Sequence, residues 1–112
     1  PIPLCADESF QGAMTLEELA ESFDVVNIKL DKSGGLTGGL QQLHKARELG
    51  LGVMVGCMVS SSLGIAPAFI LAQLADYTDL DGFVNIKHDR PNPMQLAAGQ
   101  LSAPPELWGY PR

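Results

Sequence analysis

The chain has 112 residues, with 13 acidic and 7 basic side chains, and its formal net charge is −6. That length suits a single domain, and 46% hydrophobic with 18% charged residues argues against a disordered chain. The acidic balance argues against binding to nucleic acid and against a polybasic membrane anchor. No apolar run is long enough to span a bilayer. Cys5 and Cys57 lack metal-binding spacing, so we expect reduced thiols in a cytoplasmic protein.

The chain opens on Pro1-Ile2-Pro3-Leu4 and has no initiator methionine. These residues are typical of the interior of a sequence. We therefore expect the chain to be a C-terminal piece of a longer protein, or a processed product.

Strand and helix patterns alternate along the first 82 residues. We expect strands at 2–6, 24–30, 53–58 and 76–82, and helices at 15–22, 40–49 and 66–75. Thr15 and Glu18 form a capping box at the start of the first helix. The glycine-rich stretch 33–39 fits no phosphate-binding motif and predicts a tight turn between strand and helix. The Pro-rich segment 83–112 predicts an irregular tail.

This alternation implies parallel strands joined by right-handed helical crossovers. Two architectures fit: a small doubly wound sheet, or four consecutive strands of a (β/α)₈ barrel. A complete barrel has about 250 residues, so this chain would be roughly its second half.

The faces of the strands favour the barrel. Asn27 and Lys29 share one face of the second expected strand, whereas helices would cover both faces of a doubly wound sheet. Asp7, Asp79 and Asp81 also lie at the C-terminal ends of strands, where barrel enzymes carry their chemistry. The fold class is therefore α/β, as the C-terminal half of a (β/α)₈ TIM-type barrel with an irregular tail. We expect Asp7 and Lys29 to face one cavity.

A carboxylate and a lysine that face each other across a barrel mouth suit a metal site with a general base. Aspartate is a hard oxygen ligand of the kind that Mg²⁺ prefers, and lysine can transfer a proton in the transition state.

At these residues the chain resembles the enolase superfamily, in its muconate-lactonizing-like branch. The likeness is greatest to dipeptide epimerases of the L-Ala-D/L-Glu type. Three stretches carry it: residues 6–9 (ADES), 27–36 (NIKLDKSGGL) and 79–82 (DLDG). Gly56-Cys57-Met58 also resembles the seventh-strand segment of that family. The resemblance covers residues 1–82 and is weaker in the tail.

The resemblance implies a role for each strand-end residue. Asp7 would be the third of three carboxylate ligands of Mg²⁺, and Lys29 one of two lysines that flank the substrate α-carbon. Asp79 and Asp81 would hold the α-ammonium group of a dipeptide. The expected activity is Mg²⁺-dependent epimerisation by 1,1-proton transfer through a metal-stabilised enediolate.

The same resemblance implies missing partners. In the family, the other two metal ligands, the second lysine and an N-terminal capping domain would all lie upstream of Pro1. We therefore expect residues 1–82 to need the remainder of the barrel, and the tail 83–112 to pack on the barrel or on the capping domain. The isolated chain is expected to be inactive, and whether the intact protein is a homo-oligomer is left open.

Other interpretations remain. Within the superfamily, a muconate or chloromuconate cycloisomerase, an o-succinylbenzoate synthase or an N-acylamino-acid racemase would share Asp7 and Lys29 but would hold no dipeptide ammonium. A non-catalytic folding or interaction module is the alternative from another class. Met58 and Ser60 suit either a substrate pocket or a packing role. Lys32 has the opposite parity to Lys29, which favours a loop position.

Overall fold

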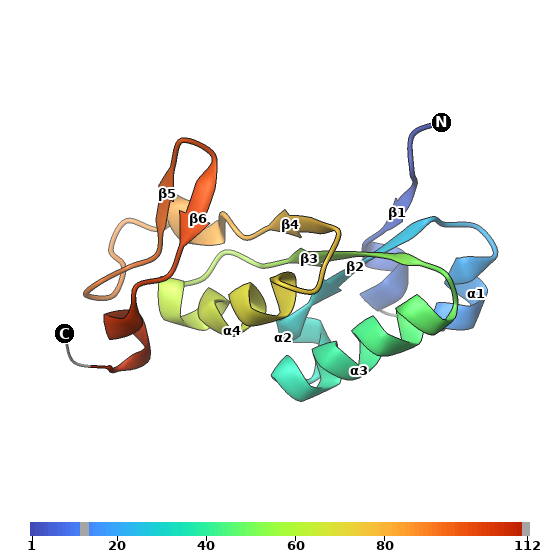
Figure 1. Ribbon diagram of the computed structural model, residues 1–112, viewed down its shortest axis with the longest axis horizontal. Coiled ribbons are helices and arrows are strands. Elements are labelled where there is room, and N and C mark those ends of the chain that lie inside the picture. The colour runs from blue at the N-terminus through green and yellow to red at the C-terminus, as the bar shows by residue number, and fades with distance from the viewer. Residues whose placement is uncertain (12–13, 111–112) are drawn as a thin grey trace.

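The computed structural model describes residues 1–11 and 14–110. Four strands form one parallel sheet in chain order, as predicted, and a separate antiparallel hairpin lies in the tail (Figure 1). The strands of the sheet are β1 (Cys5–Ala6), β2 (Val25–Lys29), β3 (Gly52–Gly56) and β4 (Tyr77–Asp79). The helices are α1 (Leu16–Ala20), α2 (Leu30–Ser33), α3 (Gly35–Glu48) and α4 (Ser62–Ala72). Within the described residues, no helix is long and apolar enough to cross a membrane.

The core lies between the sheet and the two long helices. Figure 1 shows α3 and α4 on the same side of the sheet. The strand side chains on that side are fully buried against them: Val26, Ile28, Val53 and Val55. The other side of the sheet is apolar near the N-terminal ends of the strands, where Cys5, Val25, Met54 and Tyr77 line an open hollow of about 340 Å³. The sheet is therefore packed on one face and open on the other.

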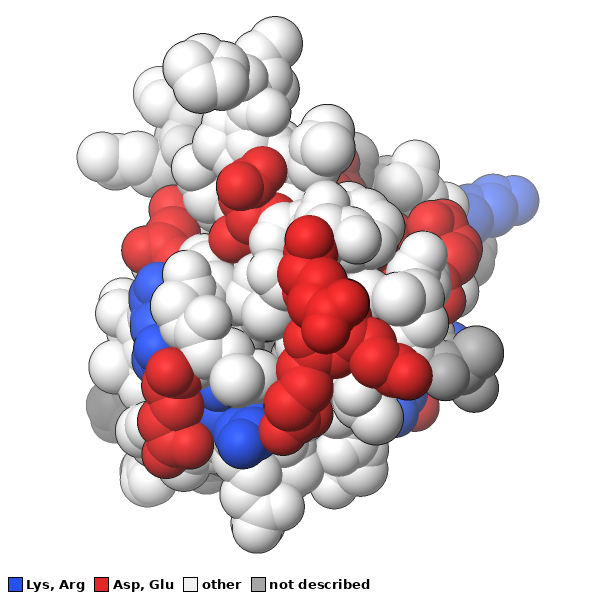
Figure 2. Space-filling model, turned by 90° about the vertical axis from the view of Figure 1, so that its right-hand side faces the viewer, with Lys and Arg blue, Asp and Glu red and all other residues white. Residues whose placement is uncertain are grey.

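The predicted capping box is confirmed. The Thr15 hydroxyl accepts a hydrogen bond from the Glu18 N–H, and the Glu18 carboxylate accepts one from the Thr15 N–H. Figure 2 views the end of the molecule that carries α1 and the N-terminus. Acidic side chains predominate over basic ones on this face, so it does not suit the phosphate backbone of a nucleic acid.

The glycine-rich stretch is helical, contrary to the prediction of a simple turn. Helix α2 follows β2 directly, and Gly34 and Gly35 have φ values of 80° and 79°, which turn the chain into α3. A Cβ atom at Gly38 would lie 1.8 Å from the Ser33 carbonyl oxygen. Glycine is needed there because α2 and the first turn of α3 come into contact. Helix α3 begins at Gly35, five residues before the predicted start at 40.

Several further boundaries differ from the prediction, among them the following. The first strand has only two residues rather than 2–6, and β4 ends at Asp79, after which Gly82–Asn85 form a 3₁₀ turn. Helix α4 begins at Ser62 rather than 66, because the Ser61 hydroxyl caps it by accepting the Gly64 N–H. Pro67 consequently lies inside the helix and not in its first turn.

The tail is more ordered than predicted. Strands β5 (Gln95–Ala97) and β6 (Gln100–Ser102) form a hairpin whose two-residue turn has positive φ at Ala98 and Gly99, typical of a type I′ turn. The Asp89 carboxylate accepts hydrogen bonds from the N–H and the hydroxyl of Ser62, and the Ser62 oxygen accepts the Met94 N–H. These bonds fasten the tail to the first residue of α4, which is completely buried.

We expect Ser62→Ala to destabilise the protein by about 2 kcal/mol, because it removes a hydrogen bond to a charged carboxylate and leaves the buried Met94 N–H without an acceptor. Urea denaturation followed by circular dichroism measures this. The control Ser102→Ala, at an exposed position of β6, should change the unfolding free energy by less than about 0.5 kcal/mol. Equal effects of the two substitutions would show that the tail is not held at Ser62.

Candidate active site

The sheet register brings polar side chains into one row. Lys29, Gly56 and Asp79 are aligned across β2, β3 and β4, and Asn27, Met54 and Tyr77 form the row below. Because alternate residues point to the same face, Asn27, Lys29 and Asp79 share the face that α3 and α4 leave open. Neighbouring strands are roughly 4.8 Å apart, which places the Lys29 and Asp79 Cα atoms about 10 Å apart. Gly56, between them, has no side chain, and the Asn27 carboxamide packs over it.

Asp7 and Lys29 meet on this face, as the sequence predicted. The Lys29 Nζ donates to Asp7 Oδ2 at 3.0 Å, and the two side chains are 16% and 31% exposed. Asp7 follows the end of β1 by one residue, and Lys29 is the last residue of β2. The other carboxylate oxygen, Asp7 Oδ1, accepts from the Gln11 Nε2 at 2.9 Å. The carboxylate is thus held by two donors from two different segments.

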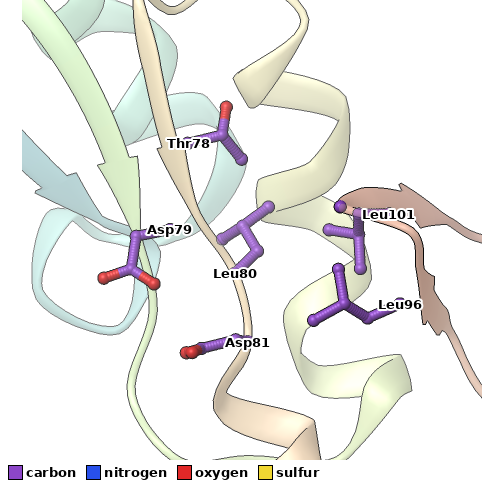
Figure 3. Close-up of a pocket in the computed structure, with 7 residues that line it drawn as sticks. Thr78, Asp79, Leu80, Asp81, Leu96 and Leu101 are labelled. Carbon is purple, nitrogen blue, oxygen red and sulfur yellow. The ribbon is translucent and has the colours of Figure 1, made fainter.

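Asp79 and Asp81 form an acidic pair at the end of β4. Figure 3 shows both carboxylates on one side of the strand and Leu80 on the other. Burial raises the pKa of Asp79, and the charge of Asp81 and a hydrogen bond with its carboxyl group raise it further; Lys29 lowers it and Asp7 adds a smaller upward effect. Two carboxylates that repel each other at the rim of a cavity form a site suited to a cation.

The hollow in Figure 3 lies between the end of β4 and the hairpin, and Asp79 and Asp81 are themselves among the residues that line it. It has a volume of about 310 Å³, and Leu80 points into it together with Leu96 and Leu101 of the hairpin. The lining is mainly apolar, and the hollow separates β4 from the tail. Asp7 and Lys29 do not line it, so the hollow meets the proposed site only at the acidic pair.

The loop after β3 reaches the same edge of the sheet. The Met58 side chain is 44% exposed, and its carbonyl oxygen would lie 2.4 Å from a Cβ atom at Gly82. The Ser60 hydroxyl lies close to Gly64, at the start of α4. Burial raises the pKa of the Cys57 thiol, partly offset by the Gly82 N–H, which disfavours the thiolate form.

Asn27 lies on the same face of β2 as Lys29, and the sequence predicted no catalytic or binding role for it. Its side chain is 5% exposed, and within the described part of the chain its Oδ1 has no hydrogen-bond partner. A Cβ atom at Gly56 would lie 2.6 Å from that oxygen, so the carboxamide occupies the space that glycine leaves. Asn27 also lines a cavity of about 40 Å³ with Lys29, Ser33 and Gln42. Ser33 and Gln42 each contribute a buried side-chain oxygen that is unpaired among the described residues.

The donor set fits a magnesium ion only in part. Asp7 supplies one hard oxygen ligand at the mouth of the sheet. In residues 1–11 and 14–110, no group of three or more His, Cys, Asp or Glu side chains could hold a metal ion. Asp7 could therefore contribute to a Mg²⁺ site whose other ligands come from elsewhere.

The family model described as "Enolase C-terminal domain-like" matches residues 1–107. The chain belongs to this family. The four parallel strands and their helices correspond to the C-terminal part of the enolase-superfamily TIM barrel. The barrel interpretation of the sequence is thereby confirmed, and the doubly wound alternative is excluded.

Two curated relatives of this chain are a racemase and an epimerase. The chain is 49% identical over 110 residues to an N-acetyl-D-glutamate racemase of Pseudoalteromonas sp, covering 97% of this chain and 35% of the racemase. It is 40% identical over 101 residues to the L-Ala-D/L-Glu epimerase of Escherichia coli K12, covering 90% of this chain and 32% of the epimerase. The enolase-family relatives are racemases and epimerases, and the chain spans about a third of their length.

Solved structures of enolase-superfamily members resemble this fold. An enolase family member from Agrobacterium tumefaciens with homology to dipeptide epimerases, bound to sodium and L-Ala-L-Glu, superposes with a TM-score of 0.86 at 45% identity. That match covers 97% of this chain and 34% of the crystallised one. A dipeptide epimerase from Enterococcus faecalis, complexed with Mg and L-Leu-L-Tyr, gives a TM-score of 0.76 at 31% identity, covering 88% and 30%.

We expect Gly56→Ala to destabilise the protein by about 1–3 kcal/mol, since the new methyl group would displace the buried Asn27 carboxamide. The comparison is a double-mutant cycle with Asn27→Ala, read by urea denaturation. Removal of the carboxamide should relieve the overlap, so Gly56→Ala should cost less in that background. Additive effects would show that the two residues are not packed against each other.

Proposed function

We propose that this chain is the C-terminal part of a Mg²⁺-dependent epimerase that acts on dipeptides of the L-Ala-D/L-Glu type. Residues 1–82 would form half of the barrel, and residues 83–112 a tail that packs on the barrel or on a capping domain. The observation that carries the proposal is the contact between Asp7 and Lys29 on the face that also bears Asp79. The names of the relatives give the proposal its substrate class.

Lys29 is assigned the proton transfer. Its side chain is mostly buried, lies on the open face of the sheet and contacts Asp7. As an amine, its Nζ would take the α-proton: the C–H bond breaks, an N–H bond forms, and the electron pair moves into the substrate carboxylate. A second base, from outside this chain, would deliver a proton to the opposite face of the α-carbon.

Asp7 is assigned to the metal. A bound Mg²⁺ supplies positive charge that stabilises the negative charge developing on the substrate carboxylate. Asp7 contributes one carboxylate to that ion, and its hydrogen bond to Lys29 keeps the base beside the metal position. The remaining ligands would come from the rest of the barrel.

Asp79 and Asp81 are assigned to the substrate α-ammonium. Their carboxylates lie at the end of β4 on the side of the sheet that carries Lys29. An ammonium group between them would relieve the repulsion that raises the Asp79 pKa. Met58 and Ser60, in the loop after β3, are proposed to border the same pocket.

The first test is hydrogen exchange at the glutamate α-carbon in the full-length protein. With Mg²⁺ and L-Ala-L-Glu in D₂O, NMR should show deuterium uptake. Lys29→Met should slow it by about 10²–10⁴-fold, because a general base is lost. Lys32→Met is the matched control, since Lys32 is exposed on α2 and has no assigned role, and it should leave the rate nearly unchanged. Uptake that survives Lys29→Met would refute the assignment.

A second candidate is racemisation of an N-acylated amino acid, favoured by the 49% identity to the N-acetyl-D-glutamate racemase. An N-acyl amino acid carries no α-ammonium group for Asp79 and Asp81 to bind. A dipeptide epimerase would therefore need Asp79 and Asp81 for substrate binding, whereas an N-acyl amino acid racemase would not.

We expect the double variant Asp79→Asn with Asp81→Asn to lower kcat/KM for L-Ala-L-Glu by at least about 10²-fold, because two charge-assisted hydrogen bonds are lost. The same assay on N-acetyl-D-glutamate provides the comparison. If the wild-type protein prefers the N-acetyl compound and the variant keeps that activity, the dipeptide proposal fails and the racemase is supported.

A further inference from the structure

The Asp7 carboxylate is held by hydrogen bonds from side chains outside its own strand. Strand β1 has only two residues, and Asp7 lies after its end, outside the register with β2. The Asp7 side chain is nevertheless fixed at both oxygens, by Lys29 and by Gln11. Lys29 belongs to the proposed chemistry, which leaves Gln11 as a contact with no assigned purpose.

Gln11 is carried by a short turn that starts at Asp7. Residues Glu8–Gln11 form the 3₁₀ turn η1, in which the Phe10 N–H donates to the Asp7 carbonyl oxygen at 3.1 Å. The Phe10 side chain packs against the core, which anchors the turn. The neighbouring Gln11 is half-buried and sends its Nε2 back to Asp7 Oδ1 at 2.9 Å. The main chain and the side chain of Asp7 are therefore tied to the same anchored turn.

We propose that Gln11 is a positioning residue for Asp7: it occupies Oδ1 and thereby presents Oδ2, the oxygen beside Lys29, as a single-oxygen ligand for the metal. This inference rests on the proposed function, because it takes Asp7 to be a metal ligand. It adds a residue that lies outside the ADES stretch and touches neither the substrate nor the ion. The Gln11 amide carries no net charge, so its contact does not compete with the cation for the negative charge of Asp7.

The physical reason is the orientation of the carboxylate. A carboxylate that turns freely loses conformational entropy when it binds an ion, whereas one that is already held does not. Partners that hold a metal-ligating carboxylate typically contribute about 10–100-fold in metal affinity. Mg²⁺ gains most from such positioning, because it demands near-octahedral geometry with short oxygen contacts.

The test is Mg²⁺ binding by isothermal titration calorimetry on the full-length protein without substrate. Gln11→Met keeps the length of the side chain but removes the donor, and it should weaken Mg²⁺ binding about tenfold or more. Gln41→Met is the matched control: Gln41 is exposed on α3 and should leave the affinity unchanged. Circular dichroism of each apoprotein shows whether the fold is retained.

A double-mutant cycle separates positioning from a structural effect. In an Asp7→Asn background, Gln11→Met should cause no further loss of affinity, since there is no carboxylate left to orient. If Gln11→Met binds Mg²⁺ like the wild type while Asp7→Asn does not, this inference fails and the metal role of Asp7 stands. If Asp7→Asn also binds normally, the proposed metal site itself is wrong.

Discussion

The site depends on the alternation of side chains along parallel strands. Because β1 to β4 run in the same direction, their C-terminal ends meet at one edge, and because every second residue points to the same face, parity decides which side chains can meet there. Asp7, Lys29 and Asp79 have the parity that brings them together on the open face. A shift of one residue in the register of β2 would turn Lys29 toward the core and place Ile28 in the cavity.

This dependence explains what could be read from the sequence. The order of strands, their parallel pairing and the contact between Asp7 and Lys29 follow from periodicity, which is a property of single strands and needs no tertiary detail. Parity favoured a barrel, whereas its enolase type came from the resemblance of the ADES, NIKLDKSGGL and DLDG stretches to that superfamily. The capping box at Thr15 was equally visible, because both of its hydrogen bonds join residues only three apart.

Features that depend on close contact between separate segments could not be predicted from the sequence. The crossing of α2 and α3 requires Gly38 to lie against the Ser33 carbonyl, and a glycine-rich stretch alone does not distinguish this from an open turn. The early start of α4 depends on Ser61 and on Asp89, which is 27 residues away from Ser62 in the sequence. Gln11 lies four residues after Asp7, a spacing that could have suggested a contact, but only the turn anchored by Phe10 directs its amide to the carboxylate.

The bond between Asp89 and Ser62 ties distant parts of the chain to the mouth of the cavity. Ser62 begins α4 and directly follows the loop that carries Met58 and Ser60, so the tail sets where that loop ends. Sequence changes in residues 83–94 can therefore shift the start of α4 and the end of that loop while every strand-end residue stays the same. The position of the loop is thus coupled to a segment that lies more than 20 residues further along the chain.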